Sequence, residues 1–494
     1  MNIFLMCMII FQVNTKWTRR PFEHIISKGV KGVYKDGYIY AGGNQANSLY
    51  YPQSPSFLIV VKYDTAGNYI FSYNYDPSDY SRILLKDFAI DNTQDIYVAF
   101  AAFKNSSQYD YGVLKFDSSE SYPVWIYIYN DSENKDDIPV SIKIGRDNKI
   151  YVAGYAYKDS IENYDFYIIK FLPCGGIAWS SFYGYTIGSV DFARDMVIDK
   201  DGNIWICGET YDMNNVSSLV LLKYDTLGNI LFSDIYNLPN ASFYPKKIIF
   251  DQIENIYVIG NCLIDGNSDY LIAKYKVYGQ REWVINYGES NNFPEIAYSC
   301  GVDTCGYIYV TGESAENIMT LKISPNSQIL WSKRLDYSLV GKEIGYDISV
   351  EESGNSFITG IVSYDTFHCD FLTLKYTSSG VLSWTILYDA ANFTDSSYSI
   401  FLDENKDIYV VGVSDTVTGD SLFIVVPTLI IIKYSEESNI KEVKRKNIFV
   451  NKNDLKGLSC DLYDILGRRI TSKNLRLPSG IYYSKKKKIV FMNK

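Results

Sequence analysis

The chain has 494 residues, a formal net charge of −10 and a sequence pI of about 5.0. This acidic balance argues against nucleic acid as a partner, because phosphate binding requires a concentrated basic face. Aromatic residues make up 16% of the sequence, and tyrosine alone occurs 46 times. Such residues favour strands, and no apolar stripe with a helical period stands out between Trp17 and Tyr434. The sequence therefore predicts an all-β protein.

The first segment, residues 1–15, contains an apolar run from Ile3 to Val13. The run has the length of a signal peptide and is too short to cross a bilayer as a helix. It lacks the basic region and the small-residue cleavage site of a standard signal. A degenerate secretion signal and an apolar cap strand over the first repeat are both compatible with it. No other segment is apolar enough to be transmembrane, so we expect no transmembrane span.

Residues 16–434 consist of one unit repeated eight times, and a repeat at fixed spacing decides the architecture. Successive copies are 48 to 57 residues apart. Each copy has an aromatic residue in an Ile-Tyr-Val-like segment, at Tyr40, Tyr97, Tyr151, Trp205, Tyr257, Tyr309, Phe357 and Tyr409. Each copy also has the lysine of a Lys-Tyr-Asp-like segment, at Lys62, Lys115, Lys170, Lys223, Lys274, Lys322, Lys375 and Lys433.

A third marker, the aromatic residue that opens the following strand, is shifted along the chain. It occurs at Trp17, Phe71, Trp125, Trp179, Phe232, Trp283, Trp331 and Trp384. Trp17 precedes the first full copy, and no counterpart follows Lys433. A ring of blades closes when one terminus supplies the strand that the other lacks, because an open edge leaves backbone groups unpaired. We therefore predict a β-propeller of eight four-stranded blades, with seven as the alternative, closed by the strand around Trp17.

The fourth copy shows the four strands of one unit most clearly. They are expected at residues 191–199, 203–208, 219–225 and 230–235. The turn from Asp199 to Asn203 is predicted to be a tight hairpin in which Gly202 adopts a positive φ. A calcium loop of Asp199, Asp201 and Asn203 is the alternative, but it lacks the downstream bidentate glutamate.

The first strand of each copy carries a polar residue four positions before the turn acid. These residues are Asp87, Lys143, Asp195, Lys247, Ser299, Asp347 and Ser399. If this strand lines the central axis, they form a mixed-charge ring near the channel. They either satisfy backbone groups between blades or form a ligand or ion site at the channel mouth. In the second case the candidate binding residues are Asp87, Lys143, Asp195, Lys247 and Asp347.

The repeat, roughly D-x-x-G-N-I-Y-V-x-G followed by K-Y-D-x-x-G-x-x-x-W, resembles the bacterial β-propeller repeats described as SBBP repeats. The resemblance covers residues 17 to 434, although the copy at Phe100 to Phe103 lacks the glycine. It implies a β-propeller in a secreted or surface protein and does not imply one activity.

After the repeats, residues 435–447 are polar and charged and are predicted to be a linker. Residues 448–494 contain short β-runs around a Pro-Ser-Gly turn and are predicted to form a small β module. This module resembles the C-terminal sorting domain of the type IX secretion system, through Tyr463, Asp464, Gly467, Arg468, Pro478, Gly480 and Tyr482. The lysine-rich segment after Tyr483 departs from the longer hairpin of that family. The resemblance implies the secretion machinery as a partner and an extracellular or outer-surface location.

Recognisable catalytic chemistry is absent from the sequence. The only histidines are His24 and His368, and neither lies in a known motif. His368, Cys369 and Asp370 are interpreted as an ordinary loop and not as a nucleophilic cluster. The eight cysteines form no C-x-x-C pair or zinc motif. We therefore expect no catalytic residues, no cofactor and no metal.

Two classes of function remain open. The first is a non-enzymatic propeller that binds a polysaccharide or an envelope protein, for which loop residues such as Asn163, Tyr164, Tyr211, Asn214 and Asn291 supply stacking and hydrogen-bonding groups. The second is a carbohydrate-active enzyme that uses axial carboxylates such as Asp87, Asp195 and Asp347. The Lys-Tyr-Asp to Trp phrase also resembles the tryptophan-docking repeats of quinoprotein dehydrogenases. That family implies a vicinal disulfide beside the quinone, and no Cys-Cys pair occurs here.

Overall fold

The computed structural model describes residues 12–21, 26–46, 56–104, 108–158, 163–186, 188–289, 293–337, 341–364, 368–389, 394–418 and 424–437, together with four short C-terminal strands. Contacts between Cα atoms place Ile10–Ser438 in one compact unit and assign the C-terminal strands to a second. The described residues contain no helix, so none of them forms a helix able to cross a membrane. The all-β prediction is confirmed for this part of the chain.

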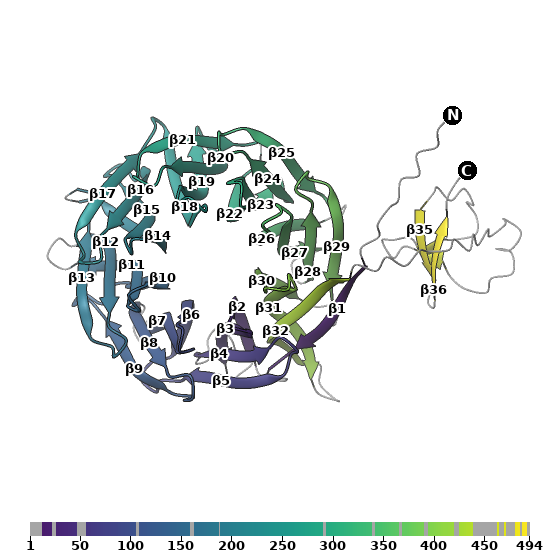
Figure 1. The fold of residues 1–494 in the computed structure, drawn as a ribbon, viewed down its shortest axis with the longest axis horizontal. Helices are drawn as coiled ribbons and strands as arrows, with labels where there is room; N and C mark the ends of the chain where they lie inside the picture. Colours follow the sequence, from purple (N-terminus) through teal and green to yellow (C-terminus); the bar gives the residue numbers. More distant parts are fainter. Residues whose placement is uncertain are drawn as a thin grey trace, which may run out of the picture. The chain divides into compact units, whose positions relative to one another are not determined.

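The large unit consists of eight antiparallel four-stranded blades, as predicted (Figure 1). Blades 1 to 4 contain β2 (Ile26–Lys35), β3 (Tyr38–Ala46), β4 (Ser56–Asp64) and β5 (Tyr69–Tyr75); β6 (Arg82–Ile90), β7 (Ile96–Phe103), β8 (Tyr109–Phe116) and β9 (Pro123–Tyr129); β10 (Ile138–Ile144), β11 (Ile150–Lys158), β12 (Asn163–Phe171) and β13 (Ile177–Tyr183); and β14 (Val190–Ile198), β15 (Ile204–Tyr211), β16 (Ser217–Tyr224) and β17 (Ile230–Tyr236).

Blades 5 to 8 contain β18 (Ala241–Phe250), β19 (Ile256–Ile264), β20 (Asn267–Tyr275) and β21 (Arg281–Tyr287); β22 (Glu295–Val302), β23 (Ile308–Ser314), β24 (Asn317–Ile323) and β25 (Ile329–Leu335); β26 (Lys342–Val350), β27 (Ser356–Ser363), β28 (Cys369–Tyr376) and β29 (Leu382–Tyr388); and β30 (Asp395–Leu402), β31 (Ile408–Thr418), β32 (Ile424–Glu437) and β1 (Gln12–Arg19). The first strand of each blade lies innermost, and β5, β9, β13, β17, β21, β25, β29 and β1 lie outermost (Figure 1). Blades 1 and 2 are also joined by a single parallel pair, Ser56 with Arg82.

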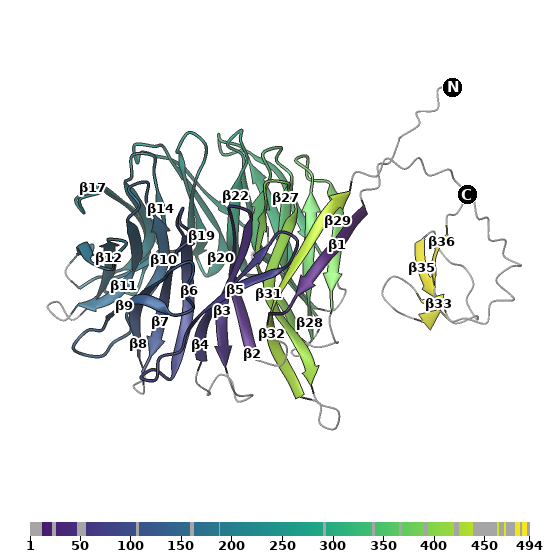
Figure 2. The same cartoon turned by 60° about the horizontal axis from the view of Figure 1, so that its bottom comes forward.

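The N-terminal strand completes the last blade, as the shifted aromatic marker predicted. Strand β1 lies beside β32 (Figure 2) and pairs with it antiparallel. Trp17 is the register partner of Lys433. Buried apolar residues of blade 8, such as Tyr409, pack with residues of blade 1, such as Tyr63, in one cluster. The two ends of the repeat region therefore meet within one sheet, and blade 8 packs against blade 1.

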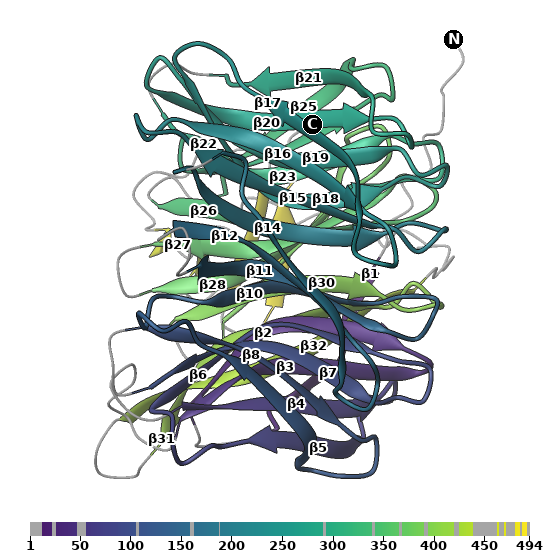
Figure 3. The ribbon, with the colours of Figure 1, turned by 90° about the vertical axis from the view of Figure 1, so that its left-hand side faces the viewer.

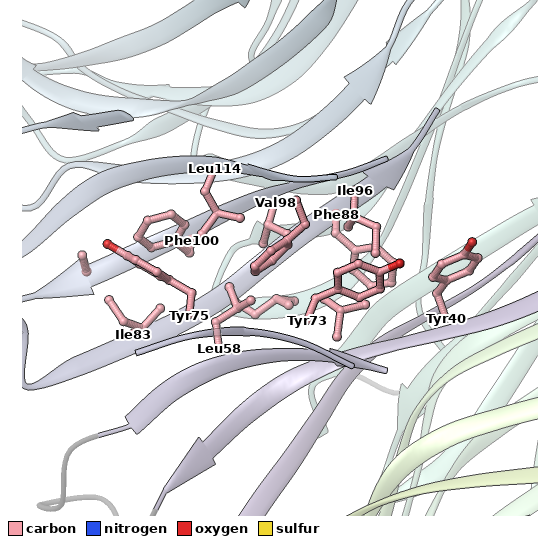
Figure 4. Packing of buried hydrophobic residues seen from close by; sticks show 14 residues of the cluster. Tyr40, Leu58, Tyr73, Tyr75, Ile83, Phe88, Ile96, Val98, Phe100 and Leu114 are labelled. Carbon is pink, nitrogen blue, oxygen red and sulfur yellow. The ribbon is translucent and has the colours of Figure 1, made fainter. Parts of the chain in front are cut away.

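The apolar core lies between blades. The buried hydrophobic side chains of the described residues form eight clusters, and each cluster is shared by two adjacent blades. In Figure 4, Leu58 and Tyr73 of blade 1 face Phe88, Val98 and Leu114 of blade 2. The side view in Figure 3 shows the strands of successive blades next to each other. No single blade buries its own apolar faces, so the blades are stabilised only as an assembled ring.

The lysine and tryptophan of the repeat form one docking device between blades. They are cross-strand partners, as in the pair Lys170 and Trp179. Lys170 Nζ and Trp179 Nε1 both donate hydrogen bonds to Thr226 O of the next blade, at 2.9 and 3.1 Å. The glycine two residues later, Gly228, approaches the indole so closely that a Cβ atom there would lie 2.9 Å from the ring. The same pattern closes the propeller, where Trp17 and Lys433 both donate to Thr65 O of blade 1.

Each first strand carries a β-bulge, which the glycine of the Ile-Tyr-Val-x-Gly segment makes room for. In blade 5 the register shifts between Pro245 and Lys247, so Lys246 is the extra residue. Gly260 faces this bulge, and a Cβ atom there would lie 2.2 Å from Tyr244 O. The copy without this glycine places Phe100 at the position and a glycine, Gly112, opposite it on β8. A bulge adds one residue to a strand and re-aims its side chain.

The second unit contains a four-stranded sheet with the order β34-β33-β35-β36. The strands are β33 (Leu462–Tyr463), β34 (Arg469–Ile470), β35 (Gly480–Ser484) and β36 (Lys487–Phe491). Tyr482 pairs with Ile489 and Tyr463 with Tyr483. Of the predicted sorting-motif residues, Tyr463, Gly480 and Tyr482 therefore lie on paired strands. Asp464, Gly467, Arg468 and Pro478 lie outside the described residues.

Candidate functional site

The predicted polar ring lies on the innermost strands of the propeller. Successive first strands contact each other all the way round, from β2 through β6, β10, β14, β18, β22 and β26 to β30 and back to β2. Asp87, Asp195, Lys247, Ser299, Asp347 and Ser399 occupy the same register on these strands, each opposite the residue two positions after the aromatic marker. The prediction that these six residues lie at the same level of the innermost strands is therefore confirmed.

The assignment of Lys143 to this register was wrong. Lys143 pairs with the aromatic marker Tyr151 itself, and Ser141 takes the register position in blade 3. The turn of blade 3 explains the difference. In this blade the residue that begins the turn, with its N–H bonded to Lys149 O, is Gly145, and the acid Asp147 lies two residues later. A count back from Asp147 therefore ends two residues after the ring position. Lys143 nevertheless reaches the ring, where its Nζ lies 3.1 Å from Asp87 Oδ2 and 2.9 Å from Ser141 Oγ.

Blade 1 contributes a further ring residue, Lys31, which the sequence reasoning missed. Its turn, Asp36 and Gly37, is a two-residue hairpin with no acid before it. The count from the turn acid therefore had no starting point in this copy. A count from the aromatic marker gives the register directly, because the ring residue lies ten positions before it in seven copies and nine before it at Tyr40. Lys31 Nζ forms an ion pair with Asp87 Oδ1.

The acidic ring residues connect adjacent blades through backbone groups. Asp87 Oδ2 accepts from the N–H of Ile142 in blade 3 at 3.0 Å, and Asp195 Oδ2 accepts from Ile248 in blade 5 at 3.2 Å. Asp347 Oδ2 accepts from Ile400 in blade 8 at 3.0 Å. Ser399 Oγ accepts from Gly32 in blade 1 at 3.2 Å, across the closure. This geometry agrees with the interpretation that the ring satisfies backbone groups between blades.

The ring also balances its own charge. Burial alone would raise the pKa of Asp87, but Lys143 and Lys31 outweigh it and hold the pKa below its ordinary value. Lys247 Nζ lies 2.7 Å from Ser299 Oγ and 3.6 Å from Asp347 Oδ1. Three lysines and three aspartates of the ring thus interact around the axis, and their carboxylates are occupied by protein donors.

A second layer of side chains lies next to this ring, at the bulge positions. We call it the bulge ring, and it consists of Val30, Lys86, Val140, Arg194, Lys246, Tyr298, Tyr346 and Tyr398. All eight keep part of their surface exposed, and a bulge turns its side chain out of the alternating pattern of the strand. The solvent that reaches the middle of an innermost strand is the solvent on the axis. The bulge ring therefore lines the axis of the propeller.

The bulge ring has an aromatic half. The ring centres of Tyr298 and Tyr346 are 5.4 Å apart, and those of Tyr346 and Tyr398 are 5.5 Å apart. Lys246 Nζ lies 4.2 Å from the centre of the Tyr298 ring. Blades 5 to 8 thus present a continuous arc, Lys246–Tyr298–Tyr346–Tyr398, which we call the tyrosine arc. Half-exposed aromatic rings beside polar groups suit the apolar faces of sugar rings.

The other half of the bulge ring, in blades 1 to 4, carries two cations, Lys86 in blade 2 and Arg194 in blade 4, and Lys246 at the start of the tyrosine arc is a third. Arg194 is neutralised by the fully buried carboxylate of Glu209, to which its Nε donates at 2.9 Å. Burial lowers the pKa of Lys246 to about 8, an effect that Glu313 opposes and Arg194 reinforces. Burial also lowers the pKa of Lys86.

Cys369 and Asp370, which were interpreted from the sequence as part of an ordinary loop, lie at the junction of blades 7 and 8. Cys369 is buried, and its Sγ lies 3.4 Å from Asp395 O. Burial raises the pKa of this thiol, which opposes a nucleophilic role. Asp370, Asp389 and Asp395 bring carboxylate oxygens within 4.8 Å of one another at the junction of blades 7 and 8. Burial raises the pKa of Asp370 to about 6.

The predicted turn of the fourth copy is confirmed, and Gly202 has a φ of 85°. Asp199 organises this turn and accepts hydrogen bonds from Asn203 N at 2.7 Å and Trp205 Nε1 at 3.1 Å. Lys223 Nζ lies 3.1 Å from Asp199 Oδ2. These protein donors explain the acid at this position without a bound ion.

The loop aromatics also pack against one another. Tyr164 and Tyr211 both contact Phe192, with ring centres 5.7 and 5.9 Å away. They form a cluster near Arg194, whose guanidinium carbon lies 5.6 Å from the Phe192 ring. Asn291 lies outside the described residues. At the turn ends of the first strands of blades 1 to 3, a hollow of about 360 Å³ is lined by Lys35, Asn92 and Arg146 among others.

The comparisons with known proteins support the fold. No protein-family model and no curated protein matches the sequence. Among solved structures, the chain is similar to a europium-containing methanol dehydrogenase, with a TM-score of 0.53 and 10% identity over 86% of this chain and 93% of that one. It is also similar to the quinohemoprotein alcohol dehydrogenase of Comamonas testosteroni, with a TM-score of 0.52 and 11% identity over 85% of this chain and 76% of that one.

The large unit is an eight-bladed β-propeller by its sheet topology, and these similarities support that fold. At 10 to 11% identity they bear on the fold alone. The resemblances to SBBP repeats and to the sorting domain rest on the motifs given above.

Proposed function

We propose that the propeller is a non-enzymatic binding protein whose ligand is a polysaccharide held on the axis at the tyrosine arc. The observation that carries this proposal is the contact of three partly exposed tyrosines, Tyr298, Tyr346 and Tyr398, across two blade junctions. Rigid aromatic rings lose little conformational entropy on binding, because packing has already fixed them.

A binding role is favoured over glycoside hydrolysis by the state of the axial carboxylates. Hydrolysis needs one carboxylic acid that can protonate the leaving group and one carboxylate that can act as base or nucleophile. Asp87, Asp195 and Asp347 instead accept backbone N–H groups of the neighbouring blades. These hydrogen bonds support a structural role for the three carboxylates.

The test is calorimetry or a glycan array with the purified full chain and the variant Tyr346→Ala. Tyr69→Ala is the matched control, because Tyr69 is 52% exposed on the outer strand β5. We expect Tyr346→Ala to weaken glycan binding roughly tenfold or more, consistent with the loss of one stacking ring, and Tyr69→Ala to have no effect. Equal binding by both variants would move the site away from the axis, and no glycan binding by the native chain would contradict the proposal.

We further propose that the C-terminal module directs export to the cell surface or the medium through the type IX machinery. The support is the order of its two motifs and the sheet that contains Tyr463, Gly480 and Tyr482. In a host with this secretion system, the chain truncated after residue 447 should stay inside the cell. Export of the truncated chain would contradict this role.

A further inference from the structure

The two lysines of the bulge ring form no direct ion pair with the described residues, and Asp136 and Glu313 act on Lys86 and Lys246 only from a greater distance. Among the described residues, no carboxylate oxygen lies within the 4.0 Å ion-pair distance of Lys86 Nζ or Lys246 Nζ. Arg194 beside them is neutralised by Glu209, and Glu313 pairs instead with Lys342 at 2.6 Å. The polar ring below balances its own charges. The positive charge left on the axis therefore comes from Lys86 and Lys246.

The positions of these two lysines relative to the tyrosine arc are informative. Lys246 belongs to the arc itself, with its ammonium over the face of Tyr298. Lys86 lies in blade 2, four blades away from Tyr298 in blade 6, and so on the opposite side of an eight-bladed ring. A ligand on the axis would meet tyrosine side chains on one side and an ammonium group on each side.

A partly buried ammonium without a carboxylate in direct contact is an unfavourable arrangement, because the more distant Asp136 and Glu313 offset only part of its desolvation. A ligand that carries carboxylate or sulfate groups would supply the missing charge, and ion pairs in a partly desolvated site are stronger than at the surface. Neutral sugars would use the tyrosines alone.

Building on the proposed function, we infer that the axial site is selective for acidic polysaccharides, whose anionic groups bind Lys246 and Lys86 while the sugar faces lie on the tyrosine arc. The overall charge of −10 repels such polymers from the rest of the surface. Selectivity then depends on these two lysines.

The experiment compares oligogalacturonate with its fully methyl-esterified form, which has the same backbone and no charge. Titration calorimetry is carried out with the native chain, Lys246→Gln, Lys86→Gln and Lys35→Gln. Lys35 is the matched control, because it lines the hollow at the turn ends of the first strands. We expect roughly tenfold weaker binding of the acid by each bulge-ring variant, no change with Lys35→Gln, and no change for the ester. Binding of the acid should also weaken with added salt.

The outcomes separate this inference from the proposed function. If the ester binds as tightly as the acid and Lys246→Gln changes neither, the acidic selectivity is wrong and the axial glycan site stands. If neither form binds, the same titrations with oligomannuronate, sulfated galactan and neutral glucan oligosaccharides decide the matter: binding of the neutral glucan alone rejects the selectivity, and binding of none rejects the proposed function. Circular dichroism of each variant shows whether it is folded.

Discussion

The backbone oxygen of Tyr244 occupies the place where a side chain at Gly260 would begin, only 2.2 Å from a Cβ atom there. This approach exists because Lys246 is inserted as an extra residue in β18. The requirement for glycine at this position of the repeat and the axial position of Lys246 thus have the same cause, the bulge in β18.

We predict that Gly260→Ala lowers the free energy of unfolding by about 3 kcal/mol, the upper range for an overpacked site. The Cβ atom would meet backbone atoms, which cannot move aside as a flexible side chain can. Urea denaturation measures the loss. Gly176→Ala is the control, because the nearest atom, Leu172 Cδ1, is 3.6 Å away, and this variant should differ from the native chain by less than about 0.5 kcal/mol. Equal effects of the two variants would contradict the role of the bulge.

The closure of the propeller depends on Trp17. We expect Trp17→Ala to destabilise the chain by about 3 kcal/mol, since the ring packs on Gly67 and its N–H donates to Thr65 O. Trp17→Phe should cost only about 1 kcal/mol, the value of the hydrogen bond, because Phe232 fills the same position over Gly279. Thermal unfolding compares the three chains. A Trp17→Ala protein as stable as the native one would show that β1 does not lock the ring.

Asp87 should matter for stability and not for glycan binding. Asp87→Ala leaves Lys31 and Lys143 without their partner, which we expect to cost about 3 kcal/mol. Because its pKa is below the ordinary value, this carboxylate contributes stability above pH 4, and the contribution is lost as the pH falls further. Denaturation at pH 7 and pH 3 should therefore show a large difference between native and variant chains at pH 7 and a reduced one at pH 3, because part of the contribution has been lost there. Loss of glycan binding in a folded Asp87→Ala chain would indicate that the glycan binds at the polar ring and not at the tyrosine arc.

Asp137 should make the propeller less stable as the pH rises. This residue is fully buried, and burial raises its pKa to about 8, despite hydrogen bonds from Asp131 N and Tyr157 N. A raised pKa gives stability that is complete below the unfolded value near 4 and is lost as the pH approaches 8. Between pH 6.5 and 8.5 the thermal midpoint of the native chain should fall, and Asp137→Asn should reduce that fall. Parallel curves for the two chains would show that Asp137 is ionised in the folded state.

The proposed selectivity for acidic polysaccharides predicts how the binding affinity changes with pH. The pKa of Lys246 is lowered to about 8 by burial and by Arg194, with Glu313 acting in the opposite direction and Tyr298 covering the ammonium. Affinity for oligogalacturonate should therefore decrease as the pH rises from 7 to 9, whereas an exposed lysine would stay charged to about pH 10. The profile of Lys246→Gln should be flatter over this range. Equal declines in both chains would assign the pH effect to another group.

Much of the fold could be predicted from the sequence, because a repeat that cannot bury its own apolar faces has few ways to assemble. Trp17 had no counterpart after Lys433, and this asymmetry indicated the closing strand. The strands of the fourth copy were also predicted to within three residues, as for the first strand, expected at 191–199 and observed at Val190–Ile198.

The site was harder to predict, and the reason is the bulge. Strict alternation of side chains does not foresee an extra residue, so Lys246 and Tyr346 were not recognised as axial. Counting from the turn acid also failed where the turn itself varied, at Lys143 and Lys31. The glycine of the Ile-Tyr-Val-x-Gly segment was the available signal, since it marks where the first strand comes too close for a Cβ atom.

The pairing of β1 with β32 also sets an order of events during synthesis. Trp17 leaves the ribosome early, yet its strand partner around Lys433 follows more than four hundred residues later. Until then β1 has no sheet to join, and the apolar face of blade 1 that packs against blade 8 in the complete ring stays uncovered. A nascent or shortened chain would thus be a target for chaperones and proteases, and the ring would assemble only after translation of the whole repeat region.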